Sequence, residues 1–490
     1  MSKKAKNLIF MSAGLVLLIA LTVILALVRD EAYTENGGPA VPAEAERIHF
    51  TELTSEDVVS ISVKNEHGEY NIVRLADGSL GVPELPGAMT IPSRLHNSAR
   101  FMSEFWAREI VAENVEPLFQ YGLEDTAARG FVTFRDGGTL EIFVGDKTPT
   151  PEDMTYVRVM RDGSKDTVYA VWSYLVDWLR EPALFYVSLD VTMDFTDAGW
   201  PRIDRFVVDR AGREQYVIEL IPWLDEEEIV INSHRLLAPV EVEVDHVKGD
   251  RITQGLFGLT AQEVVHVGAE TPEEYAHIFD DPQILATMSV GNYIATLIIG
   301  DRVFTQNEDG EDVFIGFYGI HSDHPNVLYI FSMQSLHHLL TFDTESIMAS
   351  MFHRPLIYTV SELIIETPLH SLSFTLTGED RSDEAYFLHG ELIDTDTFKD
   401  LYIFALMASA EALFVGEPEE TELMPLLARY TYRYRNGSPD TVIEFYDSGG
   451  MRSVIAIDGE PRFTTRIGYL TRLEQNIEAY LNSEPIINSW

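Results

Sequence analysis

The feature that most constrains the fold is a stretch of sequence that recurs along the chain. The residues AREIV at 107–111 return as AQEVV at 261–265, and VYAV at 168–171 returns as LYIF at 328–331. The offset between matched positions grows from 154 residues for the first pair to 160 for the second, as loop insertions would make it. Self-similarity in a fixed order predicts repeated folding units, because 490 residues exceed what one hydrophobic core organises.

Each copy begins with the pattern of a β-hairpin. Val59, Ile61 and Val63 alternate with other residues before a turn, and residues 206–208 and 363–365 open similar hairpins in the second and third copies. Alternation with a period of two is typical of a strand with one buried face. We therefore expect all three copies to start with paired strands.

A helix is predicted after each hairpin, and a strand meander and a short helix follow it. The predicted helices lie near 98–111, 250–265 and 396–413, and an amphipathic helix from Ile467 to Leu481 closes the chain. Strand and helix runs alternate without the β-α-β order that a parallel sheet requires. The sheets are therefore predicted to be mainly antiparallel.

These patterns predict an α+β fold class. A single amino-terminal transmembrane helix is followed by repeated units of antiparallel β-hairpin and meander with interleaved helices. The predicted domains are a cytoplasmic stub and transmembrane signal anchor at 1–30, a flexible linker at 31–46, and three α+β repeats at 47–200, 201–357 and 358–490.

An apolar segment near the amino terminus predicts membrane attachment. Lys3, Lys4 and Lys6 precede an apolar run from Leu8 to Val28, which as a helix spans about 31 Å, enough to cross a hydrocarbon core. The lysines are expected to stay in the cytoplasm. The predicted location is the cell membrane, with a single pass, a cytoplasmic N-terminus and a C-terminal ectodomain outside the cytoplasm.

The alternative to this anchor is a cleaved signal peptide. Such peptides have a shorter apolar region that ends at a small-residue cleavage site. The triplet Ala43-Glu44-Ala45 has suitable residues, but it lies far downstream of the apolar run and beyond charged residues. The uncleaved anchor is therefore the favoured interpretation.

The charge and composition of the chain exclude several classes of partner and site. It has 79 acidic and 35 basic residues, a net charge of −44 at pH 7, so nucleic acid and anionic lipid headgroups are repelled. It has no cysteine, which excludes disulfides, thiolate metal sites and cysteine nucleophiles. The acidic surface either confers solubility, which is the simpler interpretation, or binds calcium or adapts the protein to salt.

Three short motifs resemble a bacterial family known as domain of unknown function 4340. They are FQYGLED at 119–125, IFVGDKT at 142–148 and Val168-Tyr169, and the resemblance covers most of the chain past His49. The sequence departs from the family pattern at Thr126, where proline is usual. A second departure is the Ile-Phe pair at 278–279, which stands in place of Gly-Leu.

The resemblance implies a repeated ectodomain behind one amino-terminal span. The family has no assigned catalytic residues, so the resemblance implies none here. Some members are encoded beside subunits of ABC-type transporters. An accessory role in such a transporter, or in another envelope complex, is therefore what the resemblance implies about partners.

Histidine and carboxylate side chains are the natural candidates for a metal site. His321 and His324 lie in one segment, the pair His337-His338 follows it, and Asp301 is nearby in sequence. A zinc site needs three or four ligands that converge. His321 and His324 belong to a turn, and the side chains of 337 and 338 diverge on a helix, so no metal site is predicted.

Other carboxylates have competing interpretations. The acidic loop at 307–312 suggests calcium, but it lacks the spacing of an EF-hand and fills the place where the second copy is longer than the first. A solvated hairpin tip is the simpler interpretation. Asp146 and Asp301 recur after glycine and resemble a catalytic pair, but a strand that ends in Gly-Asp is also common turn chemistry.

An alternating segment in the third copy separates aromatic from cationic side chains. Tyr430, Tyr432 and Tyr434 alternate with Arg433 and Arg435, so one strand face is aromatic and the other is cationic. The cationic face either receives an acidic partner or pairs with carboxylates on neighbouring strands.

No catalytic, cofactor-binding or metal-binding residue is predicted. The chain has no nucleophile elbow, Walker loop, dinucleotide fingerprint or His-Glu-x-x-His motif. The leading hypothesis is a non-enzymatic, single-pass membrane protein whose acidic ectodomain binds or scaffolds. Its partners are the membrane, through Leu8 to Val28, and ABC transporter subunits or other envelope proteins, but no nucleic acid. The alternatives are an extracellular hydrolase acting on cell-wall or glycan material and a ligand-sensing ectodomain.

Overall fold

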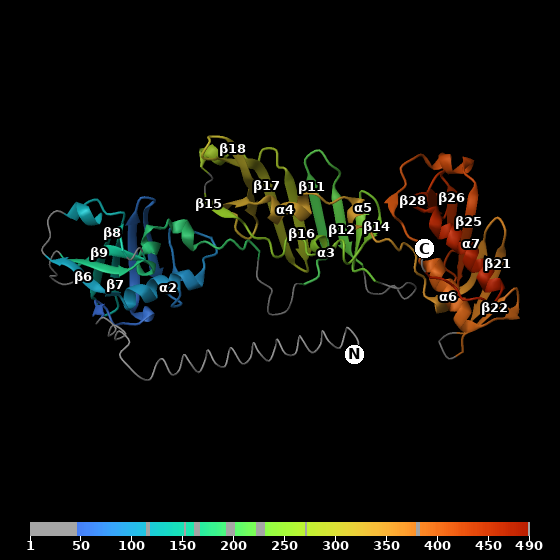
Figure 1. The fold of residues 1–490 in the computed structure, drawn as a ribbon, viewed down its shortest axis with the longest axis horizontal. Helices are drawn as coiled ribbons and strands as arrows, with labels where there is room; N and C mark the ends of the chain where they lie inside the picture. Colours follow the sequence, from blue (N-terminus) through green and yellow to red (C-terminus); the bar gives the residue numbers. More distant parts are fainter. Residues whose placement is uncertain are drawn as a thin grey trace, which may run out of the picture. The chain divides into compact units, whose positions relative to one another are not determined.

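The computed structural model describes residues 47–113, 118–150, 153–160, 167–192, 201–221, 231–269, 272–378 and 383–488. These residues form two compact units. Figure 1 shows their strands and helices, coloured along the chain from blue at the amino terminus to red at the carboxyl terminus. The first unit extends to Tyr186 apart from Leu85–Thr90, which belongs with residues from Val187 onward to the second unit.

The protein is mostly β, so the predicted α+β class is wrong. Strands make up 43% of the described residues and helices 21%. The strands form four sheets, and every pairing in them is antiparallel. The predicted antiparallel arrangement is therefore confirmed, whereas the share of helix was overestimated.

The first unit contains one large sheet and one small one. The large sheet runs in the order β4 (Leu80–Gly81), β3 (Gly68–Arg74), β2 (Val58–Asn65), β7 (Ala128–Phe134), β8 (Thr139–Lys147), β9 (Met154–Met160), β10 (Thr167–Trp172) and β6 (Glu109–Glu113). The small sheet pairs β1 (Ile48–His49) with β5 (Trp106–Ala107). The helices are α2 (Pro92–Ser103) and the 3-10 turns η1 (Ser55–Asp57), η2 (Leu118–Tyr121), η3 (Ser173–Leu175), η4 (Asp177–Arg180) and η5 (Ala183–Tyr186).

The second unit contains two sheets of nine strands. One runs in the order β14 (Val242–Val244), β13 (His234–Ala238), β12 (Tyr216–Leu220), β11 (Arg205–Arg210), β16 (Ile284–Val290), β17 (Tyr293–Gln306), β18 (Asp312–His321), β19 (Val327–Phe331) and β15 (Glu263–Val267). Its helices are α3 (Asp250–Thr253), η6 (Glu273–Tyr275), α4 (Met333–Leu340) and α5 (Thr344–Ile347).

The other nine-stranded sheet lies nearer the carboxyl terminus of the chain. It runs in the order β23 (Glu391–Leu392), β22 (Ala385–Leu388), β21 (Ser371–Thr377), β20 (Val360–Glu366), β25 (Leu426–Tyr434), β26 (Thr441–Asp447), β27 (Arg452–Ile457), β28 (Glu460–Arg466) and β24 (Ala412–Leu413). Its helices are η7 (Ile357–Thr359), α6 (Thr395–Leu406), η8 (Pro418–Leu423) and α7 (Ile467–Leu481).

The three large sheets share one strand order. In each, a first hairpin (β2–β3, β11–β12 or β20–β21) pairs with a later four-strand meander, and the strand that follows the helix returns to the far edge. Each sheet lies within one of the predicted repeats, 47–200, 201–357 and 358–490. The second and third sheets nevertheless belong to the same compact unit.

The predicted helices were too long because part of each is an edge strand. Residues 109–113, 263–267 and 412–413 form β6, β15 and β24, which pair with the last strand of the meander in their sheet. A short apolar run does not distinguish helix from strand by its period. The closing helix α7, in contrast, has the predicted bounds Ile467–Leu481 and buries Leu470, Leu473 and Ile477.

The recurring Gly-Asp pairs have a steric explanation. A Cβ atom at Gly145 would lie 2.1 Å from the carbonyl oxygen of Tyr121, and one at Gly300 would lie 2.4 Å from that of Ile278. The turn before each meander thus lies directly against the backbone of β8 or β17. Asp146 and Asp301 are exposed, and both pairs lie at register shifts within β8 and β17 rather than in turns at strand ends, so the predicted turn is wrong.

The predicted anchor Leu8–Val28 and the linker 31–46 lie outside the residues that the structure describes. Within the described ranges, no helix is long and apolar enough to cross a membrane.

Replacing Gly300 with alanine should destabilise the second unit by about 1–3 kcal/mol, because the new methyl group meets a backbone carbonyl that cannot rotate away. Gly468→Ala is the matched control, since a Cβ there meets no atom within 4 Å and the residue is helical. We expect that control to be neutral or slightly stabilising. Urea unfolding followed by circular dichroism measures both, and equal midpoints for the two variants would contradict the steric explanation.

Candidate functional site

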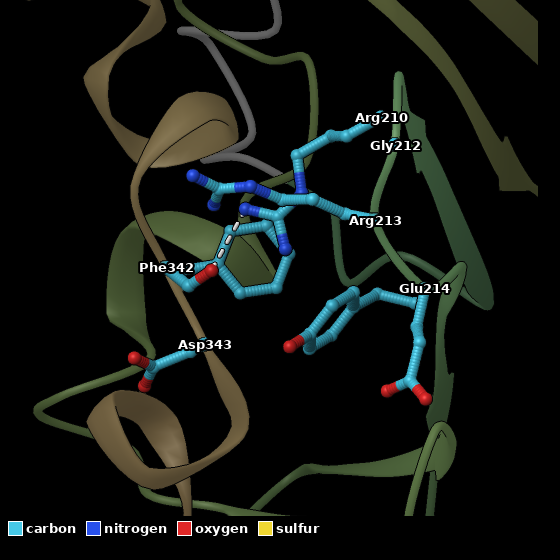
Figure 2. Close-up of a pocket in the computed structure, with 7 residues that line it drawn as sticks. Arg210, Gly212, Arg213, Glu214, Phe342 and Asp343 are labelled. Atoms are coloured by element: carbon cyan, nitrogen blue, oxygen red, sulfur yellow. Dashed lines mark hydrogen bonds between the residues drawn. The ribbon is translucent and has the colours of Figure 1, made fainter.

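A pocket of about 490 Å³ lies at the turn of the first hairpin of the second sheet (Figure 2). Ligand pockets typically enclose about 300–1,000 Å³. It is lined by Arg210, Gly212, Arg213, Glu214, Tyr216, Phe342 and Asp343. The pocket thus joins a hairpin turn to the segment between α4 and α5.

The hairpin turn forms for local reasons. The Arg213 N–H donates to the Arg210 carbonyl at 3.0 Å, which closes the turn, and Gly212 has a φ of 70° that suits glycine. Tyr216 then starts β12 opposite Val208 of β11. The sequence predicted this hairpin, but it did not indicate that the turn lines a pocket.

Arg210 is the central side chain of the pocket. It is only 4% exposed, and its guanidinium lies 4.7 Å from the centroid of the Tyr216 ring and 4.5 Å from that of the Phe342 ring, and these two rings pack edge-to-face against each other. Nη1 donates to the carbonyl of Phe342 at 2.8 Å, drawn in Figure 2, and to that of Leu340 at 3.3 Å. Burial lowers the pKa of Arg210, but an arginine remains charged at neutral pH.

The Nε atom of Arg210 is buried without a hydrogen-bond partner among the described residues. A buried donor that forms no hydrogen bond costs about 1–3 kcal/mol, and more when it is charged. An acceptor placed at this atom would therefore be favourable.

The first sheet has a comparable set of side-chain hydrogen bonds at the matching position. Asn65 ends β2 opposite the first residue of β7, as Arg210 ends β11 opposite the first residue of β16. Its side-chain Nδ2 donates to the carbonyls of Leu179, at 2.9 Å, and Glu181, at 2.7 Å. An amide is thus sufficient to tie the first hairpin to the closing helical segment, and the guanidinium of Arg210 adds charge and further donors.

The remaining polar groups of the pocket give it both signs of charge. Arg213 donates from Nη1 to the Leu340 carbonyl at 3.2 Å. Asp343 caps α5, because its Oδ1 accepts the Ser346 N–H at 2.8 Å, while Glu214 is exposed and has no ion-pair partner within the described ranges. Two guanidinium groups, two carboxylates and two aromatic rings therefore surround one space.

The pocket can hold a small polar ligand. Its described lining includes no serine, cysteine, lysine or histidine, whereas Tyr216 contributes a hydroxyl and Glu214 and Asp343 contribute carboxylates. Paired charges and aromatic rings provide orientation and affinity for such a ligand.

The histidines considered as metal ligands do not converge. His321 is fully buried on β18, its Nδ1 accepts the Asp323 N–H at 3.2 Å, and His337 is exposed on α4. Within the described residues, no group of three or more histidine, aspartate and glutamate side chains is placed to hold a metal ion.

The arginines of the third sheet pair within that sheet. Arg433 forms ion pairs with Glu362 on β20 and with Asp440, and Arg435 donates to the carbonyls of Val360, at 3.1 Å, and Leu376, at 2.7 Å. The second of the two sequence interpretations, pairing with neighbouring carboxylates, is therefore correct for Arg433.

The stability of the second sheet should depend on the protonation of His321. Burial lowers its pKa to about 4, below the 6.5 of an exposed histidine, so the unfolded chain takes up this proton more readily. The stabilising contribution is complete above about pH 6.5 and is lost as the pH falls toward 4, by up to about 3 kcal/mol.

Urea unfolding at pH 7.5 and at pH 5 measures this loss. A His321→Asn variant keeps an acceptor for the Asp323 N–H but does not titrate, so its free energy of unfolding should change less between the two pH values. An identical pH dependence in the two proteins would show that His321 does not contribute.

The comparison with known proteins identifies one family. Residues 82–277 match the family described as Domain of unknown function (DUF4340). The match covers the part of the chain from the end of the first hairpin region through β15, rather than most of the chain past His49. No curated protein and no solved structure matches the chain. The resemblance to the DUF4340 family is therefore confirmed for residues 82–277, a region that includes the hairpin side of the Arg210 pocket.

Proposed function

We propose that this chain is a non-enzymatic binding protein, and that its Arg210 pocket takes a small zwitterionic ligand of the amino-acid type. The observation that carries the proposal is the pocket lining, in which the guanidinium groups of Arg210 and Arg213 and the carboxylates of Glu214 and Asp343 surround one space. Each charge of such a ligand has an opposite charge available in the pocket.

The ligand carboxylate is assigned to the two guanidinium groups. Arginine presents several N–H donors in one plane, which suits a carboxylate with two oxygens. Arg210 is held in place by the rings of Tyr216 and Phe342, so little side-chain entropy is lost when it binds. Arg213 lies at the same turn and adds a second positive charge.

The ligand ammonium is assigned to Glu214 or Asp343. A simple anion would be repelled by a chain with a net charge of −44, whereas a zwitterion has no net charge. A dianion such as phosphate would also meet these two carboxylates at close range. The rings of Tyr216 and Phe342 favour an apolar side chain on the ligand.

The proposal includes a location and partners that rest on the sequence alone. We place the protein at the cell membrane, attached through Leu8 to Val28, with the described units outside the cytoplasm. We further propose that it is accessory to an ABC-type transporter or another envelope complex. The apolar run, the lysines before it and the resemblance to DUF4340 support these points.

Titration calorimetry with three probes tests the ligand assignment. Free leucine should bind the full chain, while N-acetylleucine, which lacks the ammonium, and leucine amide, which lacks the carboxylate, should each bind at least tenfold more weakly. One lost charge-assisted contact of about 1.4 kcal/mol is a factor of ten.

Matched variants locate the binding. Arg213→Gln and Glu214→Gln should each weaken leucine binding by about tenfold, because both residues are exposed and each removes one pocket charge. Arg205→Gln is the control. Arg205 lies on β11, the strand that ends at Arg210, but it pairs with Glu219 outside the pocket. Loss of binding in the control to the same extent, or no binding of leucine at all, would refute the assignment.

Accessibility tests the location independently of the ligand. In intact protoplasts of a strain that expresses the full chain, added protease should digest the described units and leave the amino-terminal segment with the membrane. Protection of the described units, or recovery of a mature protein that begins near Asp30 or after Ala45, would contradict this part of the proposal.

A further inference from the structure

The hairpin formed by β17 and β18 is longer than its counterparts in the other sheets. β17 has 14 residues and β18 has 10, whereas β8 and β9 have 9 and 7, and β26 and β27 have 7 and 6. The second sheet therefore contains additional paired residues that the shared fold does not require.

The additional residues project past the neighbouring strands. On one side β16 pairs with β17 only as far as Ile299, and on the other β19 pairs with β18 only from Phe317 to Gly319. Past Ile299 on β17 and up to Phe317 on β18, residues 302–306 of β17 pair with residues 312–317 of β18. We call residues 302–317 the arm, and most of it is a two-stranded ribbon (Figure 1).

The arm exposes aromatic and aliphatic side chains. Phe304 lies opposite Phe314, with ring centroids 5.8 Å apart in an edge-to-face arrangement, and Phe314 lies 5.2 Å from Phe317. Phe304 is 53% exposed and Val313 is 42% exposed. Residues 316–317 at the base of the arm lie against β19, whereas residues 304–314 pair with no third strand. An exposed aromatic side chain on such a ribbon is typical of a contact surface for a partner.

The tip of the arm is acidic and well defined. It carries Glu308, Asp309, Glu311 and Asp312 without any basic residue. The Oδ1 atom of Asn307 accepts the N–H of Asp309, at 3.0 Å, and that of Glu311, at 2.8 Å, so the turn is held in one shape. The carboxylates are thus presented next to the phenylalanine pair by a rigid turn.

We infer that the arm is a docking surface for a partner protein that presents basic side chains around an apolar patch. The argument is charge complementarity, because four carboxylates at the tip attract lysine and arginine while the phenylalanine pair supplies apolar contact. A second copy of this chain is disfavoured, since its net charge of −44 repels another copy. The inference is independent of the Arg210 pocket.

A labelled synthetic peptide serves as the probe, with lysines on one face of a helix and leucines on the other. Two control peptides replace either all leucines with serine or all lysines with glutamate. Fluorescence anisotropy with the full chain should show binding of the first peptide only. Binding should weaken at least tenfold between 50 mM and 500 mM salt, because exposed ion pairs are screened.

Variants of the arm then locate the contact. Phe304→Thr with Phe314→Thr, and separately Glu308→Gln with Asp309→Asn and Glu311→Gln, should each weaken peptide binding at least tenfold. Ile294→Thr is the apolar control, since Ile294 is 64% exposed at the other end of β17. Glu417→Gln with Glu419→Gln and Glu420→Gln is the charge control at another acidic turn.

The results of these experiments distinguish a basic partner protein from non-specific attraction and from a second copy of the chain. Weaker binding in both arm variants and unchanged binding in both controls supports the inference, provided that circular dichroism shows each variant to be folded. Equal losses in arm and control variants would mean non-specific attraction and overturn it, as would wild-type binding by the arm variants. A concentration-dependent dimer that the Phe304→Thr and Phe314→Thr changes abolish would overturn it in favour of a second copy.

Discussion

The three sheets depend on one long-range pairing, in which the first strand of the hairpin lies beside the first strand of the meander. Ile61 is opposite Val132, Val208 is opposite Ala286, and Leu363 is opposite Tyr432. All six side chains are buried. Closing such a long loop has an entropic cost, and burial of these apolar pairs contributes the stabilisation that offsets it. Once this pair forms, the hairpin and the meander extend the sheet on either side.

Local patterns in the sequence were sufficient for part of this fold. The alternation around Ile61, the hairpins and the closing helix α7 follow from periodicity within one element, and the structure contains them. The predicted class failed where a segment had no clear period. Residues 109–111 were included in a helix, but residues 109–113 form the edge strand β6, because their partner is Thr167–Ala170 of β10. That partner follows much later in the chain, and local reasoning has no access to it.

The same limit applies to the Arg210 pocket. In the sequence, Arg210 belongs to a short polar turn, where an arginine is usually exposed. It is buried because Phe342, far along the chain, lies over its guanidinium. The one available signal was the occurrence of two arginines in a single turn of so acidic a chain. For the recurrent Gly-Asp pairs the sequence favoured a structural role, and the close approach of the Tyr121 and Ile278 carbonyls to Gly145 and Gly300 gives the physical reason for the glycines, which local sequence could not show.

The hydrogen bonds that Arg210 donates to backbone carbonyls have a thermodynamic consequence for the rest of the second unit. The guanidinium holds the carbonyls of Leu340 and Phe342, and α5 begins two residues after Phe342. Within α5, Glu345 accepts the Leu413 N–H of β24 at 3.0 Å, which connects this segment to the third sheet. A ligand that replaced the bonds from the guanidinium to these two carbonyls would remove contacts that hold the segment. By linkage, such binding would change the stability of the Leu413 contact by the same factor by which that contact changes ligand affinity at Arg210.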